Sequence, residues 1–354
     1  MRGDRFGIHR VIEPVGTLPQ AAWRLDNDLG RLYDDEILID VERLNIDSAS
    51  FVQMEEGMGD DPARQAAVRT LITRTVAERG KQHNPVTGSG GMLLGRVARV
   101  GEALRGTGPH ATLRVGDRIA TLVSLSLTPL VLEEIVSIDL HRHQVAVRGR
   151  AVLFESGMWA LLPDDLPESV ALAALDVAGA APQVARLVAR ARAGGIAHPT
   201  VVVLGCGGKS GLLCSAAARR AGGRVVGIER SEQAAAGARA LGACDAIEIA
   251  DAADALAVAA AVARAAGREV DLAVSCVNVP DAEMGAILAT RDGGTIYFFS
   301  MATSFTKAAL GAEGVSRDVD MLVGNGYAPG HAEATLSLIR SEPRLRAIFV
   351  ERFG

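Results

Sequence analysis

The chain has 354 residues, of which 49% are hydrophobic and 22% are charged, and its net charge at pH 7 is -5. This composition is typical of a globular protein with one large or two ordinary domains, and it argues against long disordered segments. The acidic balance and the aromatic content of 4% argue against nucleic acid as a partner, since phosphate-binding surfaces usually carry a basic excess.

The sequence has no pattern typical of a membrane span, a secretory signal or a disulfide framework. Uncharged stretches such as residues 119–132 are well short of the roughly 20 apolar residues that cross a bilayer, so no membrane partner is expected. Residues 1–7 lack the apolar core of a secretory signal, which predicts a cytoplasmic protein. The four cysteines form no C-x-x-C pair, so we expect small buried thiols and no disulfide framework.

The first half of the chain has the pattern of a β domain. Residues 36–42 alternate apolar and polar side chains, as a half-buried strand does, and further strands are predicted at 95–100, 117–122 and 144–147. One amphipathic helix is predicted at residues 61–79. Together these elements favour a barrel-like β domain.

The pattern of apolar residues changes near residues 162–167. After this point the predicted strands are continuous apolar runs, as in parallel sheets buried on both faces. Strands are predicted at 201–204, 224–228, 246–249, 270–275, 294–299 and 318–323, and helices at 210–221, 231–241, 252–266 and 332–339. This alternation predicts a doubly wound parallel α/β sheet.

A glycine turn joins the first of these strands to its helix, with Gly205, Gly208 and Gly211 at the turn and Lys209 and Ser210 between the last two. Glycines let a backbone approach a diphosphate, whose charge then lies on free N–H groups at the helix N-terminus. The spacing is not a strict G-x-G-x-x-G, and a tight structural turn is the alternative. The order strand, turn, helix, strand and acid favours a dinucleotide site.

The acid is Glu229, 24 residues after Gly205, where dinucleotide folds bind the adenosine ribose. A carboxylate there repels a 2′-phosphate and slightly favours NAD, whereas Arg230 could bind that phosphate, so NADP stays open. Lys209 could neutralise the diphosphate or be a solvated loop lysine. Ser275 and Ser300, near the ends of two later strands, complete the predicted cofactor set.

The β-rich first half followed by a cofactor half resembles the medium-chain dehydrogenase/reductase superfamily, on residues 34–41, 95–101 and 115–119. The resemblance implies an α/β protein with a GroES-like β-barrel catalytic domain, 1–164, completed by a C-terminal return, 343–354, and a Rossmann domain, 165–342. Zinc-dependent members carry ligands where this chain has Asp47, Ser89 and Gly90, so we predict no zinc.

More narrowly, the blocks at residues 6–14, 44–51, 78–91 and 122–129 resemble the L-erythro-3,5-diaminohexanoate dehydrogenases of lysine fermentation. The resemblance implies NAD(P)-dependent oxidative deamination of a small diamino acid at its 3-amino group. A homodimer is also expected, because strand 318–323 lies at a sheet edge in the superfamily.

A doubly cationic substrate needs acids in its pocket, and its ammonium must lose a proton before hydride can leave. The candidate catalytic residues are Asp47, Asp176, His83, Lys81 and Ser89. Asp47, Asp176 or His83 could take the proton, with Glu155 a weaker candidate acid. For Asp176, placed inside an apolar helix, a structural ion pair or cap is as plausible, and His83 could be a surface histidine. Lys81 or Lys307 could meet the substrate carboxylate.

Two other functions remain open on the sequence. A zinc-free NADPH-dependent quinone or enoyl reductase shares the domain plan, but it needs an apolar pocket with few acids. A cofactor-binding protein without catalysis would place no demand on the pocket acids.

Overall fold

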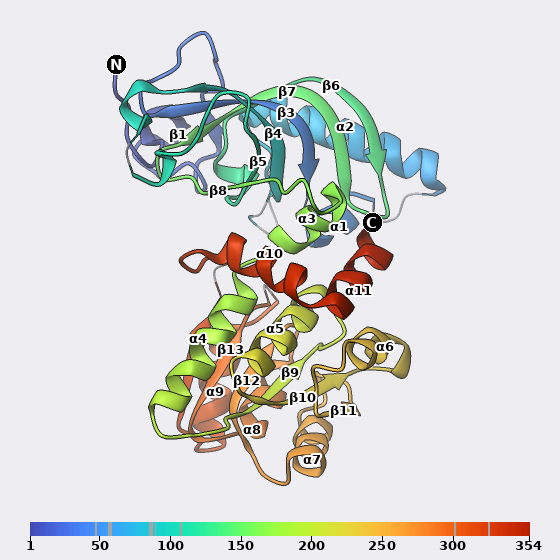
Figure 1. Ribbon diagram of the computed structural model, residues 1–354. Coiled ribbons are helices and arrows are strands. Elements are labelled where there is room, and N and C mark those ends of the chain that lie inside the picture. Colours follow the sequence, from blue (N-terminus) through green and yellow to red (C-terminus); the bar gives the residue numbers. More distant parts are fainter. Residues whose placement is uncertain are drawn as a thin grey trace. The chain divides into compact units, whose positions relative to one another are not determined.

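The chain folds into two compact units, Met1–Glu168 and Ser169–Gly354, shown in Figure 1. The computed structural model describes residues 1–46, 48–55, 59–84, 88, 90–106, 108–300, 302–324 and 326–354. The predicted boundary at residue 164 lies close to the boundary between the units.

The first unit is built on an antiparallel sheet in the order β6-β7-β3-β4-β5-β8. In β3, Ile37, Ile39 and Val41 are buried while Asp40 between them is exposed, which is the alternation seen in the sequence. The sheet strands are β3 (Glu36–Asn45), β4 (Met92–Val100), β5 (Arg118–Thr121), β6 (Leu130–Asp139), β7 (Gln144–Phe154) and β8 (Trp159–Leu161), and a separate pair comprises β1 (Val11–Glu13) and β2 (Arg24–Leu25). The predicted strands are confirmed, and β6 and β8 are additions.

The helix α2 (Asp61–Arg79) has the bounds that the sequence predicts. Asp60 caps its N-terminus by accepting a hydrogen bond from the Ala63 N–H, an arrangement that satisfies one of the free N–H groups of the first turn. Val68, Ile72 and Val76 are buried and belong to the same core cluster as the sheet. The unit also contains α1 (Ser48–Glu55) and short 3₁₀ turns at Ile8–Arg10, Glu102–Leu104, Gly108–His110 and Leu125–Leu127.

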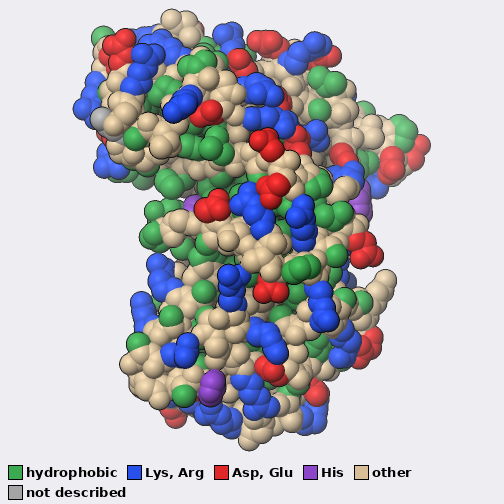
Figure 2. Space-filling view, in the orientation of Figure 1, with side chains coloured by type: hydrophobic (Ala, Val, Ile, Leu, Met, Phe, Trp, Pro, Cys, Tyr) green, Lys and Arg blue, Asp and Glu red, His purple; other side chains and the backbone are tan. Residues whose placement is uncertain are grey.

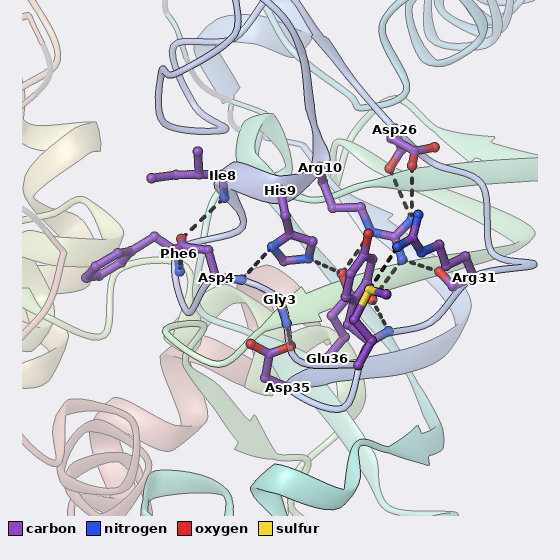
Figure 3. Close-up of polar contacts among 12 residues, drawn as sticks. Gly3, Asp4, Phe6, Ile8, His9, Arg10, Asp26, Arg31, Asp35 and Glu36 are labelled. Carbon is purple, nitrogen blue, oxygen red and sulfur yellow. Dashed lines mark hydrogen bonds and ion pairs between the residues drawn. The ribbon is translucent and has the colours of Figure 1, made fainter.

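A buried ion pair fixes the N-terminal segment of this unit (Figure 3). The Arg10 guanidinium donates to both oxygens of Glu36, at 2.8 and 2.7 Å, and both side chains are fully buried. His9 Nδ1 accepts from the Asp4 N–H at 2.8 Å, so the neutral ring carries its proton on Nε2, which donates to Glu36 at 2.9 Å. Glu36 therefore ties the N-terminus to the start of β3.

The second unit contains a six-stranded parallel sheet in the order β11-β10-β9-β12-β13-β14. Its strands are β9 (Thr200–Leu204), β10 (Arg224–Glu229), β11 (Ala246–Ile249), β12 (Val270–Ser275), β13 (Thr290–Phe298) and β14 (Val319–Val323). All residues of β9 and β12 are buried, as the continuous apolar runs predict. This is the doubly wound order, in which the chain reverses direction across the sheet between β9 and β12.

Helices cover both faces of the parallel sheet (Figure 1). In one layer α5 contacts α4 and α6; in the other α8 contacts α7 and α9. The helices are α3 (Glu168–Leu175), α4 (Ala180–Ala193), α5 (Lys209–Arg220), α6 (Glu232–Leu241), α7 (Ala255–Ala266), α8 (Glu283–Ala289), α9 (Phe305–Gly314), α10 (His331–Ser341) and α11 (Pro343–Phe353). No single helix in the described ranges is long and apolar enough to cross a membrane; only α3 and α4 taken together pass on length and composition, and they are bent by 48°.

The C-terminal segment differs from the expectation. Residues 343–354 were expected to return to the first domain, but they belong to the second unit as α11, which packs against α6 and α10. Leu345 and Phe349 of α11 are buried.

Acidic and basic side chains are interspersed on the face of the molecule shown in Figure 2. Many arginines form exposed ion pairs with nearby acids, such as Arg148 with Glu134 and Arg264 with Glu248. Exposed pairs of this kind contribute at most about 1 kcal/mol each.

Candidate functional site

The glycine turn lies at the carboxyl end of β9, where doubly wound folds bind their ligands. Gly205 adopts a φ of 76°, which a side chain would disfavour. A methyl group added at Gly211 would lie 2.0 Å from the Gly205 carbonyl oxygen, so only glycine allows this close approach of helix to turn. The backbone conformation therefore requires glycine at Gly205 and Gly211, whereas a methyl group at Gly208 would meet only an ordinary contact, at 3.5 Å.

The N-terminus of α5 opens from this turn. Gly208 caps the helix without a side-chain hydrogen bond, and the N–H groups of Lys209, Ser210 and Gly211 belong to the first turn, which has no intrahelical acceptors. Such groups, together with the helix dipole, attract an anion. The turn fits the diphosphate of a dinucleotide.

Glu229, the last residue of β10, points back to the same turn. Its Oε1 accepts a hydrogen bond from the Gly207 N–H at 2.9 Å, and its Oε2 accepts one from the Arg230 N–H at 3.1 Å. Glu229 thus holds the glycine turn. Arg230 is exposed beside it.

Arg352 of α11 is a residue that the sequence reasoning missed. Its guanidinium donates to the Gly207 carbonyl oxygen at 2.7 Å, so Glu229 and Arg352 hold the two ends of one residue in the turn. A spacing of 145 residues leaves no local signal by which the pair could have been found.

The prediction that Asp176 lies inside a helix is wrong. Asp176 directly follows Leu175, the last residue of α3. Its Oδ2 lies 2.5 Å from Lys209 Nζ, and the two side chains are 23% and 25% exposed. Of the interpretations left open, the structure contains the ion pair. Because Lys209 is the first residue of α5, this pair places a carboxylate beside the glycine turn.

The predicted serines lie at strand ends in the second unit. Ser275 is the buried last residue of β12 and pairs in register with Leu204 of β9. Ser300 follows β13, and its Oγ accepts from the Ala302 N–H at 3.1 Å. Gly205, Ser275 and Ser300 therefore all lie at the carboxyl ends of strands of the parallel sheet.

In the first unit, Lys81 and His83 lie on the loop after α2. Lys81 is fully buried, and its Nζ donates to the carbonyl oxygens of Pro19 and Gln20 at 2.7 and 3.2 Å. Burial, with a smaller contribution from Arg79, lowers the pKa of Lys81 to about 8. These contacts favour a structural role in this loop over contact with a substrate carboxylate.

His83 Nδ1 lies 2.7 Å from Arg79 Nη1, so Nδ1 is the acceptor and Nε2 carries the proton. Burial, followed by the charges of Lys81 and Arg79, lowers the pKa of His83 to about 4. A neutral imidazole with so low a pKa is a weak acceptor for an ammonium proton.

The other candidates divide into two groups. Lys307 is exposed and forms an ion pair with Asp281, and Glu155 forms one with Arg2 at 3.2 Å. Asp47 and Ser89 lie outside the described residues. Among the residues that the structure describes, no three His, Cys, Asp or Glu side chains gather as a metal ion would require.

The family model of the L-erythro-3,5-diaminohexanoate dehydrogenase N-terminal domain matches residues 9–163. A protein named L-erythro-3,5-diaminohexanoate dehydrogenase from Acetoanaerobium sticklandii is 50% identical over 100% of both chains. One of the same name from Fusobacterium nucleatum is 51% identical over 99% of both.

The fold has solved counterparts. A mycobacterial protein solved in complex with NADPH superimposes with a TM-score of 0.54 at 16% identity, covering 90% of this chain and 89% of that one. This likeness confirms the predicted fold class, a GroES-like β unit followed by a Rossmann unit. On the full-length identity to both relatives, the chain belongs to the L-erythro-3,5-diaminohexanoate dehydrogenase family.

Proposed function

We propose that the protein catalyses the NAD(P)-dependent oxidative deamination of L-erythro-3,5-diaminohexanoate to 5-amino-3-oxohexanoate and ammonia. The observation that carries the proposal is the identity of 50% over the whole length of a relative with that name. The glycine turn at Gly205, which the backbone conformation requires, supports the dinucleotide part independently.

The second unit supplies the groups that would bind the dinucleotide. The free N–H groups of α5 and the Lys209 ammonium would face its diphosphate, and Glu229 would accept hydrogen bonds from its adenosine ribose. A bound nicotinamide dinucleotide accepts the hydride from the carbon that bears the 3-amino group. Arg352 keeps the turn in place from the opposite side of Gly207.

The protein must also move protons. The 3-ammonium loses one before hydride can leave, and a water attacks the resulting iminium to release ammonia. The Nδ1 lone pair of His83 already accepts from Arg79, and Nε2 carries the ring proton. This favours a carboxylate for the first step, and Asp47 and Asp176 are the candidates. The ion pair with Lys209 gives Asp176 a second possible role, which is to position that lysine at the turn.

The direct test is turnover of L-erythro-3,5-diaminohexanoate by the purified protein with NAD or NADP, followed at 340 nm and by ammonia release. We expect one ammonia per reduced dinucleotide. As a matched substrate control, 3-aminohexanoate lacks the 5-ammonium and should be a much poorer substrate. Turnover of a quinone or an enoyl thioester with NADPH, and none of the diamino acid, would refute the proposal.

The two roles of Asp176 are separable by a double-mutant cycle with Lys209. Loss of a general base costs about 10²- to 10⁴-fold in kcat, so Asp176→Asn should lower kcat by that amount if Asp176 takes the proton. If it only positions Lys209, Asp176→Asn and Lys209→Met should each raise the KM for the dinucleotide, and the double variant should add nothing. Unchanged kcat in Asp176→Asn would leave Asp47 as the base.

The cofactor preference is testable at Glu229. Glu229→Gln keeps an oxygen that can accept from the Gly207 N–H but removes the charge that repels a 2′-phosphate. We expect the preference for NAD over NADP to fall, with the turn intact. Glu229→Ala, which also loses the hydrogen bond to Gly207, should weaken both dinucleotides.

A further inference from the structure

Two thiols lie near the junction of β9 and β12, where the order in which the chain adds strands to the parallel sheet reverses. Cys276 directly follows β12, and its N–H donates to the Leu204 carbonyl oxygen of β9 at 2.9 Å. Because the glycine turn begins at the next residue of that strand, Cys276 borders the crevice in which doubly wound folds bind ligands. Its side chain is partly exposed.

The second thiol belongs to Cys214, on α5, and is fully buried. Its Sγ lies 3.9 Å from Sγ of Cys276. A disulfide needs a sulfur separation of about 2.05 Å, so the two atoms have less than 2 Å to travel. Cys276 lies in a segment with neither helix nor strand structure, so it can make most of this movement while Cys214 stays on its helix.

The two thiols differ in reactivity. The hydrogen bond with Cys276 and burial raise the pKa of the Cys214 thiol well above its usual range, so Cys214 stays protonated and shielded. Cys276 is the thiol that a dissolved oxidant can reach. This order, an accessible thiol oxidised first and a buried neighbour that resolves it, is the usual one for a reversible thiol pair.

We propose that Cys214 and Cys276 form an oxidation site that a peroxide converts to a disulfide, and that this disulfide weakens dinucleotide binding. In the first step hydrogen peroxide oxidises the Cys276 thiol to a sulfenic acid and releases one water. In the second, the Cys214 sulfur bonds to the Cys276 sulfur as the S–O bond breaks, and the leaving hydroxide takes the Cys214 proton and departs as a second water. The two thiols thus give two electrons and two protons to the peroxide, and a dithiol reverses the change.

The expected effect on dinucleotide binding rests on the proposed dinucleotide function. It follows from the position of Val277, the residue after Cys276. Val277 packs against the glycine turn so closely that a methyl group at Gly205 would lie 2.8 Å from Val277 Cγ1. Drawing Cys276 toward α5 shifts this contact at the turn that would hold the diphosphate. Loss of one hydrogen bond to a charged group corresponds to about a tenfold loss of affinity.

The other two cysteines provide a control. Cys206 and Cys244 both lie near Gly227 of β10, where an added methyl group would be 2.6 and 3.1 Å from their sulfurs. Cys244 is also partly exposed. Cys244→Ser therefore removes a comparable thiol that has no part in the proposed disulfide.

The test treats the reduced full-length protein with hydrogen peroxide, blocks the remaining thiols and maps disulfides by mass spectrometry of peptides. We expect a Cys214–Cys276 linkage in the wild type and in Cys244→Ser, and none in Cys276→Ser or Cys214→Ser. The Kd for NADH, measured by its fluorescence, should rise about tenfold or more on oxidation, return with dithiothreitol, and stay constant in Cys276→Ser.

The peptide map tests the oxidation site, and the binding measurement tests the effect of the disulfide on dinucleotide affinity. A linkage between Cys206 and Cys244, or Cys276 oxidised without a linkage, overturns the oxidation site. A Cys214–Cys276 disulfide with unchanged NADH affinity overturns its effect on binding. A reduced protein that binds neither NADH nor NADPH overturns the proposed dinucleotide function, and the peptide map then still decides the oxidation site.

Discussion

Replacing Glu36 by Gln tests how strongly the buried ion pair with Arg10 holds the first unit together. Oε1 of Glu36 accepts from Arg10 Nε and His9 Nε2, and Oε2 accepts from Arg10 Nη2 and the Tyr33 N–H. Whichever position the new amide nitrogen takes, it faces two donors and can accept from neither. The Arg10 charge also loses its fully buried carboxylate partner, and only the more distant and more exposed Asp26, at 3.7 Å, remains.

Removing one partner of a buried ion pair destabilises a protein by about 3 to 5 kcal/mol. In a unit of this size about 1 kcal/mol shifts Tm by roughly 2 to 4 °C, so we expect Glu36→Gln to lower the Tm of the first unit by about 10 °C. Both tryptophans, Trp23 and Trp159, lie in the first unit. Tryptophan fluorescence during urea or thermal unfolding therefore reports on that unit.

Glu134→Gln is the matched control, because Glu134 forms an ion pair with Arg148 across β6 and β7 with exposed fractions of 46% and 70%. Such a pair contributes at most about 1 kcal/mol. If Glu36→Gln lowers stability no more than Glu134→Gln does, burial of the Arg10 pair is not what stabilises the N-terminal segment.

The same carboxylate predicts an acid response. Burial raises the pKa of Glu36, but the hydrogen bonds from Arg10, His9 and Tyr33 outweigh it and lower the pKa to about 2, from 4.5. A folded-state pKa below the unfolded value stabilises the fold above about pH 4.5, and this contribution is lost as pH falls toward 2. It amounts to about 3 kcal/mol at most, and the stability of Glu36→Gln should depend less on pH over that range.

Four further outcomes are expected. Gly211→Ala should weaken dinucleotide binding at least about tenfold, since its methyl group meets the Gly205 carbonyl, whereas Gly314→Ala, in open space within α9, should leave binding unchanged. Arg352→Ala should raise the dinucleotide Kd about tenfold, without the loss of helix content that would mark misfolding. Elemental analysis should find no stoichiometric zinc and chelators should not alter activity, because the sequence resemblance implies that Asp47, Ser89 and Gly90 replace the ligands of zinc-dependent dehydrogenases; about one zinc per chain would contradict this. Sedimentation should find a homodimer, because β14 is an edge strand with Val323 51% exposed, and a monomer at micromolar concentration would argue against it.

The sequence by itself determined the features that depend on neighbouring residues. The parallel sheet could be predicted because strands that are buried on both faces consist mostly of apolar residues, as β9 and β12 do. The bounds of α2 followed from the separation of its polar and apolar faces. The glycine turn at Gly205 was legible because a tight turn restricts the side chains it can carry.

Imperfect periodicity hid part of the first unit. In β6 the buried positions do not alternate, and the register with β7 shifts at two places, so the period of two that marks a strand is broken. β8 has three residues, which is too short for any pattern to repeat.

Only the tertiary structure decided which distant residues meet. The contacts of Arg352 with Gly207, Asp176 with Lys209 and Cys214 with Cys276 span 145, 33 and 62 residues. A residue's own spacing and neighbours specify whether it lies on a helix or a strand, but not which element packs against it. The role of Asp176 beside the glycine turn, and of α11 behind it, therefore emerges only when the sheet and its helices bring these segments together.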